Sequence, residues 1–242
     1  MSQEVASTVV VLQPGYLPWL GFFDQMRRAD IFVYYDDVQF DKHGWRNRNR
    51  IKSPAGPHWL TVPVRRERLD QRILDVEIDN RSAWARKHTG TIRQFYARAP
   101  YLGSFLPELE ELLHRRWERI VDLDVAVVEM ICRWLGLEHR RTARSSELGI
   151  HGERSQRLLD LCLHFGASRY LTGDAARSYL EVDLFARHNV EVQWHDYKHP
   201  VYPQQHGPFI PYLSVLDLLL NCGDESAAIL AVDDALVEGE KA

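Results

Sequence analysis

The chain has 242 residues, with 30 lysines and arginines against 34 aspartates and glutamates, so its formal net charge is −4. This balance excludes the generally basic class of nucleic-acid-binding proteins. Hydrophobic residues make up 45% and charged residues 26%, which supplies enough apolar material for a core and excludes a disordered chain. No apolar run approaches the ~18 residues that a membrane span requires, so we expect no membrane span.

The cysteines and the N-terminal residues indicate the compartment. Cys132, Cys162 and Cys222 form no Cys-x-x-Cys pair and no disulfide framework. Residues 1–8 lack the basic and apolar regions of a signal peptide. We therefore expect a cytoplasmic protein with reduced thiols. Cys222, at the end of a predicted helix, is the one cysteine that we expect to be reactive.

The first predicted elements form a βαβ unit. Residues 8–13 are an apolar, β-branched run that ends at Pro14-Gly15, which predicts a buried strand followed by a tight turn. Leu20, Phe23 and Met26 recur near helical spacing, and residues 31–35 form a second apolar run. A right-handed crossover would place the two strands parallel in one sheet.

A hairpin and a helical stretch are predicted next. Residues 48–51 and 59–64 flank a Pro- and Gly-containing turn, which predicts the hairpin. Helical periodicity follows over 83–98, 106–116 and 125–135. We expect Ser82 to cap the first of these helices, and Asp122 or Asp124 to open the third.

Strands and helices alternate again in the second half. The predicted strands are 139–143, 169–172 and 190–194; the predicted helices are 155–165 and 213–220, with Ser214 as the N-cap of the second. This order predicts one α/β domain over 1–242, with a Rossmann-like, largely parallel sheet and flanking helices. Segments 8–78 and 139–222 would form the sheet, 82–135 a lateral helical subdomain, and 223–242 an acidic tail.

The turn after the first strand is the first candidate site segment. Ligands of open α/β sheets bind at the carboxyl ends of the strands, and a following helix N-terminus suits an anion. We therefore expect Gln13, Tyr16 and Trp19 to bind substrate. The turn lacks the glycines of a dinucleotide fingerprint or P-loop. A rigid, packed turn without a ligand explains its residues equally well.

The loop after the second strand is the second candidate segment. Asp36 and Asp37 are candidate catalytic acids that would hold an amine or act as bases. The candidate binding residues here are Gln39, His43, Asn47 and Arg48. Arg46, Arg48 and Arg50 alternate, so in an extended strand they would share one face and hold phosphate or carboxylate. The alternative is an acidic turn followed by a basic edge that discourages strand pairing.

Residues 195–211 are the third candidate segment, because their Pro, His, Gly and Gln content predicts a long ordered loop. His195, His199 and His206 lie in it, and His199 is our candidate for the catalytic base. Tyr202 and Gln204 are candidate substrate-binding residues. The histidine spacing matches no zinc pattern, so we expect no metal site. The alternative is a loop whose prolines set its path and whose histidines bond the backbone.

Several blocks of residues resemble the WbqC-like protein family. They are Gln13-Pro14-x-Tyr16-Leu17-Pro18-Trp19-x-Gly21-Phe22-Phe23, Asp36-Asp37-Val38-Gln39-Phe40, Trp45-x-Asn47-Arg48-x-Arg50-Ile51, Tyr202-x-Gln204 and Phe209-Ile210-Pro211-x-Leu213-Ser214. The middle segment 158–179 also fits, so the resemblance covers about residues 8–230. Ordered blocks over this length are far more specific than one short motif.

The resemblance implies attachment of an acyl or aminoacyl group to an amine, such as that of an amino sugar, in O-antigen-type polysaccharide or specialised-metabolite biosynthesis. The acyl donor would be a thioester on a carrier protein or CoA, and the acceptor an amino sugar or nucleotide sugar. Two alternatives stay open: a nucleotide-binding ligase or nucleotidyltransferase-like enzyme using ATP and Mg²⁺, and a non-catalytic scaffold of glycan assembly. Nucleotidyltransferases of similar fold carry His-x-Gly-His in the first turn, where this chain has Pro18-Trp19-Leu20-Gly21.

Overall fold

The computed structural model describes residues 7–41, 44–138 and 140–231. The candidate binding residue His43 and the end of the acidic tail lie outside these ranges. The described chain divides into two compact units, each made of separate segments. Unit 1 consists of residues 7–13, 24–37 and 140–197, and unit 2 of residues 14–23, 38–41, 44–138 and 198–231.

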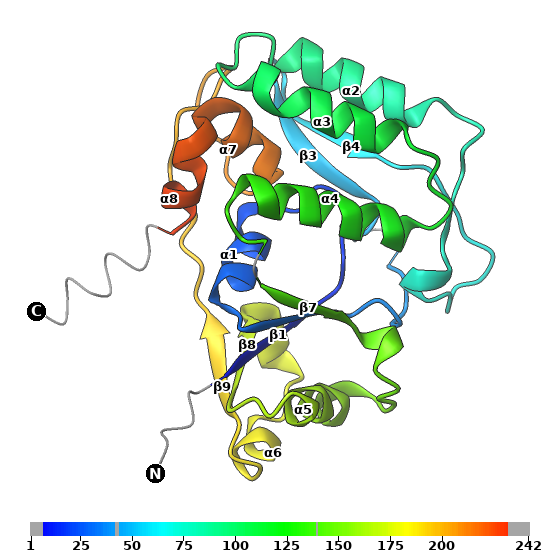
Figure 1. The fold of residues 1–242 in the computed structure, drawn as a ribbon, viewed down its shortest axis with the longest axis vertical. Coiled ribbons are helices and arrows are strands. Elements are labelled where there is room, and N and C mark those ends of the chain that lie inside the picture. The colour runs from blue at the N-terminus through cyan, green and yellow to red at the C-terminus, as the bar shows by residue number, and fades with distance from the viewer. Residues whose placement is uncertain (1–6, 42–43, 139, 232–242) are drawn as a thin grey trace, which may run out of the picture. The chain divides into compact units, whose positions relative to one another are not determined.

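Unit 1 is built on a five-stranded parallel sheet in the order β7-β2-β1-β8-β9 (Figure 1). The strands are β1 (Thr8–Leu12), β2 (Ile31–Tyr34), β7 (Arg141–Arg144), β8 (Arg169–Gly173) and β9 (Glu191–His195). Val9 of β1 lies opposite Ile31 of β2 on one side and Tyr170 of β8 on the other. The prediction of a Rossmann-like α/β fold with a parallel sheet flanked by helices is confirmed.

One face of this sheet packs on helices α5 (Arg154–His164) and α6 (Val182–Ala186). Alternate residues of β1, such as Val9 and Val11, reach this face because successive side chains of a strand point to opposite sides. Val10, on the other face, is buried as well. A strand buried on both faces has the continuous apolar run seen at residues 8–12.

Unit 2 combines two small antiparallel sheets with helices. The strands are β3 (Arg48–Ser53), β4 (Gly56–Thr61), β5 (Val64–Arg65) and β6 (Glu77–Ile78); the helices are α2 (Trp84–Phe95), α3 (Leu102–His114), α4 (Ile120–Trp134), α7 (Val215–Cys222) and α8 (Ser226–Leu230). The predicted hairpin is β3–β4, and α2 packs on α3 and on β3 (Figure 1). Helix α1 (Leu20–Arg28) has residues in both units.

Short 3₁₀ turns complete the described elements. They are η1 (Ile73–Asp75), η2 (Ser145–Glu147), η3 (Asp174–Ser178) and η4 (Gly223–Glu225). None of the helices within the described ranges combines the length and the apolarity needed to cross a bilayer.

Three predictions about individual residues are wrong. Helix α2 begins at Trp84 after Ala83, with no side-chain cap, so Ser82 does not cap it. Helix α4 already begins at Ile120, which places Asp124 inside it as a fully buried residue. Cys222 is buried, and burial raises the pKa of its thiol to about 11, so it is not an activated thiol.

The predicted N-cap of the helix after the third candidate segment is confirmed. The Ser214 hydroxyl accepts a hydrogen bond from the backbone N–H of Leu216, 3.3 Å away, at the start of α7. Asp217, three residues after the cap, does not complete a capping box. Its carboxylate instead accepts a 2.6 Å hydrogen bond from the Tyr96 hydroxyl.

Candidate functional site

The two candidate catalytic acids lie in unit 1, at the carboxyl end of β2. The buried Asp36 carboxylate accepts hydrogen bonds from the Ser146 backbone N–H at 3.0 Å and from the Ser146 hydroxyl at 2.8 Å. Asp37 is bound by the Ser145 hydroxyl at 2.6 Å and by the guanidinium of Arg157 on α5. These contacts join the end of β2 to η2 and α5. Their geometry accounts for both acids structurally, and a catalytic role stays a prediction.

A second buried ion pair of unit 1 holds His195, a histidine of the third candidate segment. Its Nε2 lies 2.7 Å from the carboxylate of Asp24 on α1, and both side chains are almost completely buried. Arg27 and Arg28 donate to the same carboxylate. Although burial opposes ionisation, these partners hold the pKa of Asp24 below its ordinary value. Because Asp24 thus binds the last residue of β9, the pair explains His195 structurally.

In unit 2, the structure brings together parts of all three candidate segments. The Tyr16 N–H donates to the Trp45 carbonyl at 3.2 Å, and the Asn49 side chain donates to the Leu17 carbonyl at 2.7 Å. A Cβ at Gly15 would approach the Trp45 carbonyl oxygen to 2.8 Å, so the glycine is needed for this close approach. The first turn and the loop before β3 are therefore packed against each other.

The residues that directly follow the third segment join them. The Ser214 N–H donates to the Arg50 carbonyl at 2.8 Å, and the Val215 N–H donates to the Pro18 carbonyl at 2.9 Å. A guanidinium N–H of Arg50 also donates to the Tyr212 carbonyl at 3.3 Å. Backbone hydrogen bonds thus fix the relative positions of these three segments, which are far apart in sequence.

Aromatic rings and arginines gather where the segments meet. We call this the aromatic–arginine surface; it consists of Trp19, Trp45, Arg48, Arg50, Trp59 and Tyr212. The Trp45 and Trp59 rings lie 5.3 Å apart and are 44% and 43% exposed. The guanidinium of Arg48 lies 4.6 Å from the Trp59 ring, and that of Arg50 lies 5.4 Å from the Trp45 ring. Half-exposed rings with adjacent guanidinium groups suit an anionic ligand that also has an apolar face.

His199 adjoins this surface through Tyr212, whose ring lies 5.2 Å from the imidazole and 5.5 Å from Trp19. The His199 Nδ1 lies 2.9 Å from the Pro200 carbonyl oxygen. Because a carbonyl can only accept, Nδ1 carries the proton, and in the neutral ring the lone pair is on Nε2. Burial lowers the pKa of His199 below its ordinary value of 6.5, against the effect of this hydrogen bond. The ring is therefore neutral at neutral pH, the state that a base requires.

A buried lysine holds the loop that carries His199. Lys52 is 0% exposed, and its ammonium group donates to Gln204 Oε1 at 3.0 Å and to the carbonyl oxygens of Gly207 and Pro208 at 3.3 and 2.6 Å. Three acceptors match the three protons of a lysine ammonium. Gln204 also pairs with the Ile210 backbone at both ends of its amide. This candidate binding residue is thereby committed to the structure of the loop.

The remaining candidate binding residues have varied surroundings. Tyr16 is fully buried, and its hydroxyl lies 2.9 Å from Nδ1 of His88. Asn47 is buried and donates to the Val62 carbonyl at 2.8 Å, whereas Gln39 is exposed and donates to the Leu69 carbonyl at 2.8 Å. Tyr202 is buried, with its ring 6.2 Å from His199. Gln13 is half-buried and lies in unit 1.

Arg46, Arg48 and Arg50 were expected to share one face of a strand, and this holds only for Arg48 and Arg50. Both lie in β3, whereas Arg46 precedes the strand. Burial lowers the pKa of Arg46, and the nearby carboxyl of Asp124 opposes this effect. Burial raises the pKa of Asp124 well above its ordinary value, against the effect of the Arg46 charge. Arg46 is therefore part of the interior of unit 2.

A cavity of about 570 Å³ adjoins the aromatic–arginine surface at Arg48. Its lining also includes Asn47, Thr61, Arg66 and Arg68. Two candidate binding residues, Asn47 and Arg48, thus lie at a space large enough for a small ligand. Within the described ranges, no group of three or more His, Cys, Asp or Glu side chains is arranged to hold a metal ion.

Sequence reasoning missed Trp59, Tyr212 and Arg157 as parts of these sites. The hairpin register places Trp59 directly opposite Arg50, and this pairing follows from the turn length once both strands are recognised. Arg157 and Tyr212 carry no comparable local signal, because their partners are distant in sequence. Lys52 continues the alternation of Arg48 and Arg50, but nothing in the local pattern indicates that it is buried.

The fold and these surroundings define an α/β protein with a Rossmann-like parallel sheet and a second unit that carries an aromatic–arginine surface. The model of the WbqC-like protein family matches residues 13–229, and the chain belongs to this family. It is 35% identical over 221 residues to the uncharacterized protein Rv1507c of Mycobacterium tuberculosis, a match that covers 90% of this chain and 95% of that protein. No solved structure matches the chain.

Proposed function

We propose that the chain is an amide-forming N-acyltransferase that transfers an acyl or aminoacyl group from a thioester to the amine of an amino sugar. The carrying observation is His199, a neutral imidazole with its lone pair on Nε2, held beside the aromatic–arginine surface. The resemblance of the motif blocks to the WbqC-like family supports the choice of reaction.

The reaction needs a base because an amine attacks only in its unprotonated form. In the proposed step, His199 Nε2 removes a proton from the ammonium group. The amine nitrogen then forms a bond to the thioester carbonyl carbon, and the carbon–sulfur bond breaks. The thiolate leaves and takes up the second proton that the nitrogen loses as the amide forms, which gives the thiol. A base with a pKa near or below neutrality and two reactants held in position account for most of the acceleration that such a step requires.

Recognition of the acceptor is assigned to the aromatic–arginine surface. The apolar face of a sugar ring stacks on exposed indole rings, as Trp45 and Trp59 present them. Arg48, next to the 570 Å³ cavity, is placed to hold a phosphate or carboxylate by bidentate hydrogen bonds. An amino sugar that carries a nucleotide or phosphate group fits both features.

The test is incubation with acyl thioesters and a panel of amino sugars and nucleotide amino sugars, followed by mass spectrometry of the products. We expect an amide product that His199→Gln lowers about a hundredfold or more, the usual contribution of a general base. His188→Gln, at an exposed histidine of unit 1, is the matched control. Absence of an amide with every pair, or equal activity of the two variants, would refute the proposal.

The pH profile gives a second readout from the same assay. Because burial lowers the pKa of His199, the ring remains neutral and able to act as a base down to below pH 6.5. We expect the rate to fall as the pH falls through the lowered pKa. A profile that is flat over this range would contradict His199 as the base.

One observation favours a nucleotide-binding ligase as a second candidate. In unit 1, the strand order is β7-β2-β1-β8-β9. After β1, the chain adds β2 and β7 on one side of β1, and then β8 and β9 on the other side. The boundary between β1 and β8 is a topological switch point, where open α/β sheets bind nucleotides. Running the same assay with free acid, ATP and Mg²⁺ distinguishes the candidates, because this ligase would release AMP or ADP.

A further inference from the structure

A second cavity of unit 2 lies between the N-terminal turn of α2 and the C-terminal end of α3. Its volume is about 720 Å³. Its lining residues include Arg65, Arg81, Arg86, Arg115 and Arg116. None of the candidate residues of the proposed acyl transfer is among them. The lining holds five arginines and no acidic residue.

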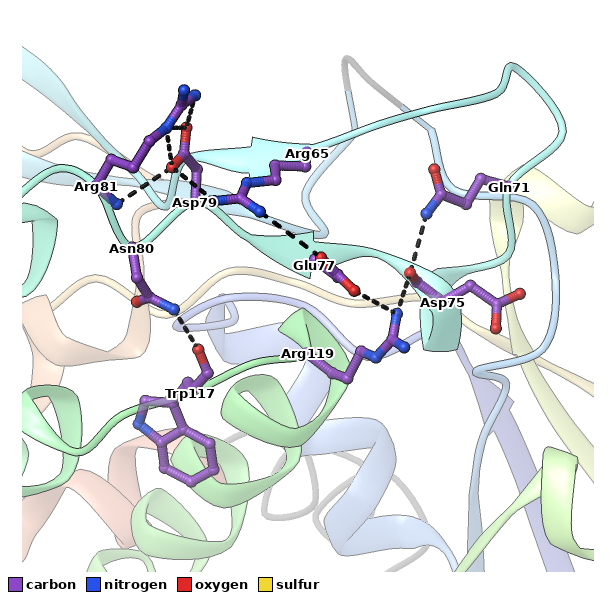
Figure 2. Close-up of polar contacts among 9 residues, drawn as sticks. All are labelled: Arg65, Gln71, Asp75, Glu77, Asp79, Asn80, Arg81, Trp117 and Arg119. Carbon is purple, nitrogen blue, oxygen red and sulfur yellow. Dashed lines mark hydrogen bonds and ion pairs between the residues drawn. The ribbon is translucent and has the colours of Figure 1, made fainter.

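Acidic neighbours neutralise only part of this charge. Arg81 lies 2.6 Å and Arg65 lies 3.8 Å from the carboxylate of Asp79. Figure 2 shows both arginines directed at this carboxylate. Hydrogen bonds from Arg81 hold the pKa of Asp79 well below its usual range, so this carboxylate stays ionised. Arg65 also lies 4.0 Å from Glu77, and Arg115 lies 3.1 Å from Glu111.

Arg86 and Arg116 have no ion-pair partner in the part of the chain that the structure describes. Their positive charges add to the cavity without compensation by a neighbouring acid. The negative end of the α3 dipole explains arginines at residues 115 and 116. Arg65 and Arg81 pair with Asp79, but neither the dipole nor an acidic neighbour explains Arg86 on α2. The five arginines together favour a ligand with negative charge.

The backbone adds hydrogen-bond donors to the same cavity. The first N–H groups of a helix have no partner within the helix, and α2 begins without a side-chain cap. Ser82, Ala83, Trp84, Ala85 and Arg86 all belong to the lining. Trp84, Ala85 and Leu113 give one part of the cavity an apolar wall. The cavity therefore combines anion-binding groups with an apolar wall.

We propose that this cavity is a binding site for an organic diphosphate of the nucleoside diphosphate type. Guanidinium groups from several sides would bind the two adjacent phosphates, since each guanidinium can donate to two phosphate oxygens at once. The apolar wall would contact the nucleoside. The volume lies within the range of known small-molecule sites. This inference does not depend on the proposed acyl transfer.

The test is isothermal titration calorimetry of the full chain with ADP, UDP, inorganic pyrophosphate and inorganic phosphate. We expect both nucleoside diphosphates to bind, and the double variant Arg86→Gln/Arg116→Gln to weaken binding at least tenfold. The matched control is Arg98→Gln/Arg187→Gln, which removes the same charge from exposed positions outside the lining. We expect the control to change the Kd less than twofold.

Three outcomes would overturn the proposal. The first is that neither nucleoside diphosphate binds the unmodified chain. The second is equal binding by the two double variants, which would place the bound ligand elsewhere, including at the switch point of unit 1. The third is inorganic phosphate or pyrophosphate binding as tightly as ADP, since the apolar wall would then contribute nothing. Thermal unfolding of both variants, with unchanged midpoints, confirms that each is folded.

Discussion

At the scale of single residues, burial decides which polar groups are available for chemistry. From the sequence, Asp36 and Asp37 are candidates to bind an amine. In the structure, hydroxyl, backbone N–H and guanidinium groups donate to their carboxylate oxygens. His199 and His195 are four residues apart, yet His195 is paired with the buried Asp24, whereas His199 lies beside the ring of Tyr212 with its Nδ1 at the Pro200 carbonyl. The difference follows from which partners each side chain meets in the fold.

Lys52 illustrates the energetic consequence of a buried charge. Lys52→Met removes the ammonium donor shared by three acceptors, of which Gln204 Oε1 keeps the Ile210 N–H whereas the Gly207 and Pro208 carbonyls lose this partner. It also removes the positive charge near Asp217. Breaking such a buried charged cluster costs about 3–5 kcal/mol of unfolding free energy. Urea unfolding of the two proteins measures this loss.

Lys87→Met is the matched control for this change, because Lys87 is an exposed lysine of α2. We expect the control to stay within about 0.5 kcal/mol of the unmodified chain. Equal effects of the two substitutions would show that the Lys52 hydrogen bonds do not stabilise the loop.

At the scale of elements, local patterns predicted most helices and strands but not all of their ends. The apolar runs at 8–12 and 31–34 form parallel strands, because a strand buried on both faces needs apolar residues at nearly every position. The start of α4 was misplaced, since Asp124 resembles a helix-opening acid but lies buried in the second turn. A propensity for helix starts does not reveal burial by distant elements.

The Ser214 cap is the element-scale feature that we expect to matter most for the third segment. Ser214→Ala removes the acceptor for the Leu216 N–H, and loss of such a cap costs about 1 kcal/mol of unfolding free energy. Urea unfolding measures it, with Ser104→Ala as the control, because Ser104 is exposed on α3 and does not cap that helix. A loss no larger than that of the control would mean that water replaces the cap at no cost.

At the scale of the whole molecule, the proposed enzyme and the alternative scaffold make opposite predictions. In cells that lack the native gene, an enzyme with His199 as its base loses function with His199→Ala and keeps it with Arg93→Glu or Arg133→Glu on α2 and α4. A scaffold that binds its partner through the helices of residues 82–135 shows the reverse. The measurement is the amount of the acylated glycan restored by each variant.

The sequence by itself determined the alternation of strands and helices, the parallel sheet, the hairpin and membership of the family. These features depend on local periodicity and on ordered motif blocks, both of which are visible along the chain. Only the tertiary structure decided which of the singled-out side chains meet. Asp37 finds Ser145 and Arg157 at separations of 108 and 120 residues, and Lys52 finds Gln204 at 152 residues. The net charge of −4 likewise gives no indication of the five-arginine cavity, because a sum over the chain does not show where charged side chains lie in space.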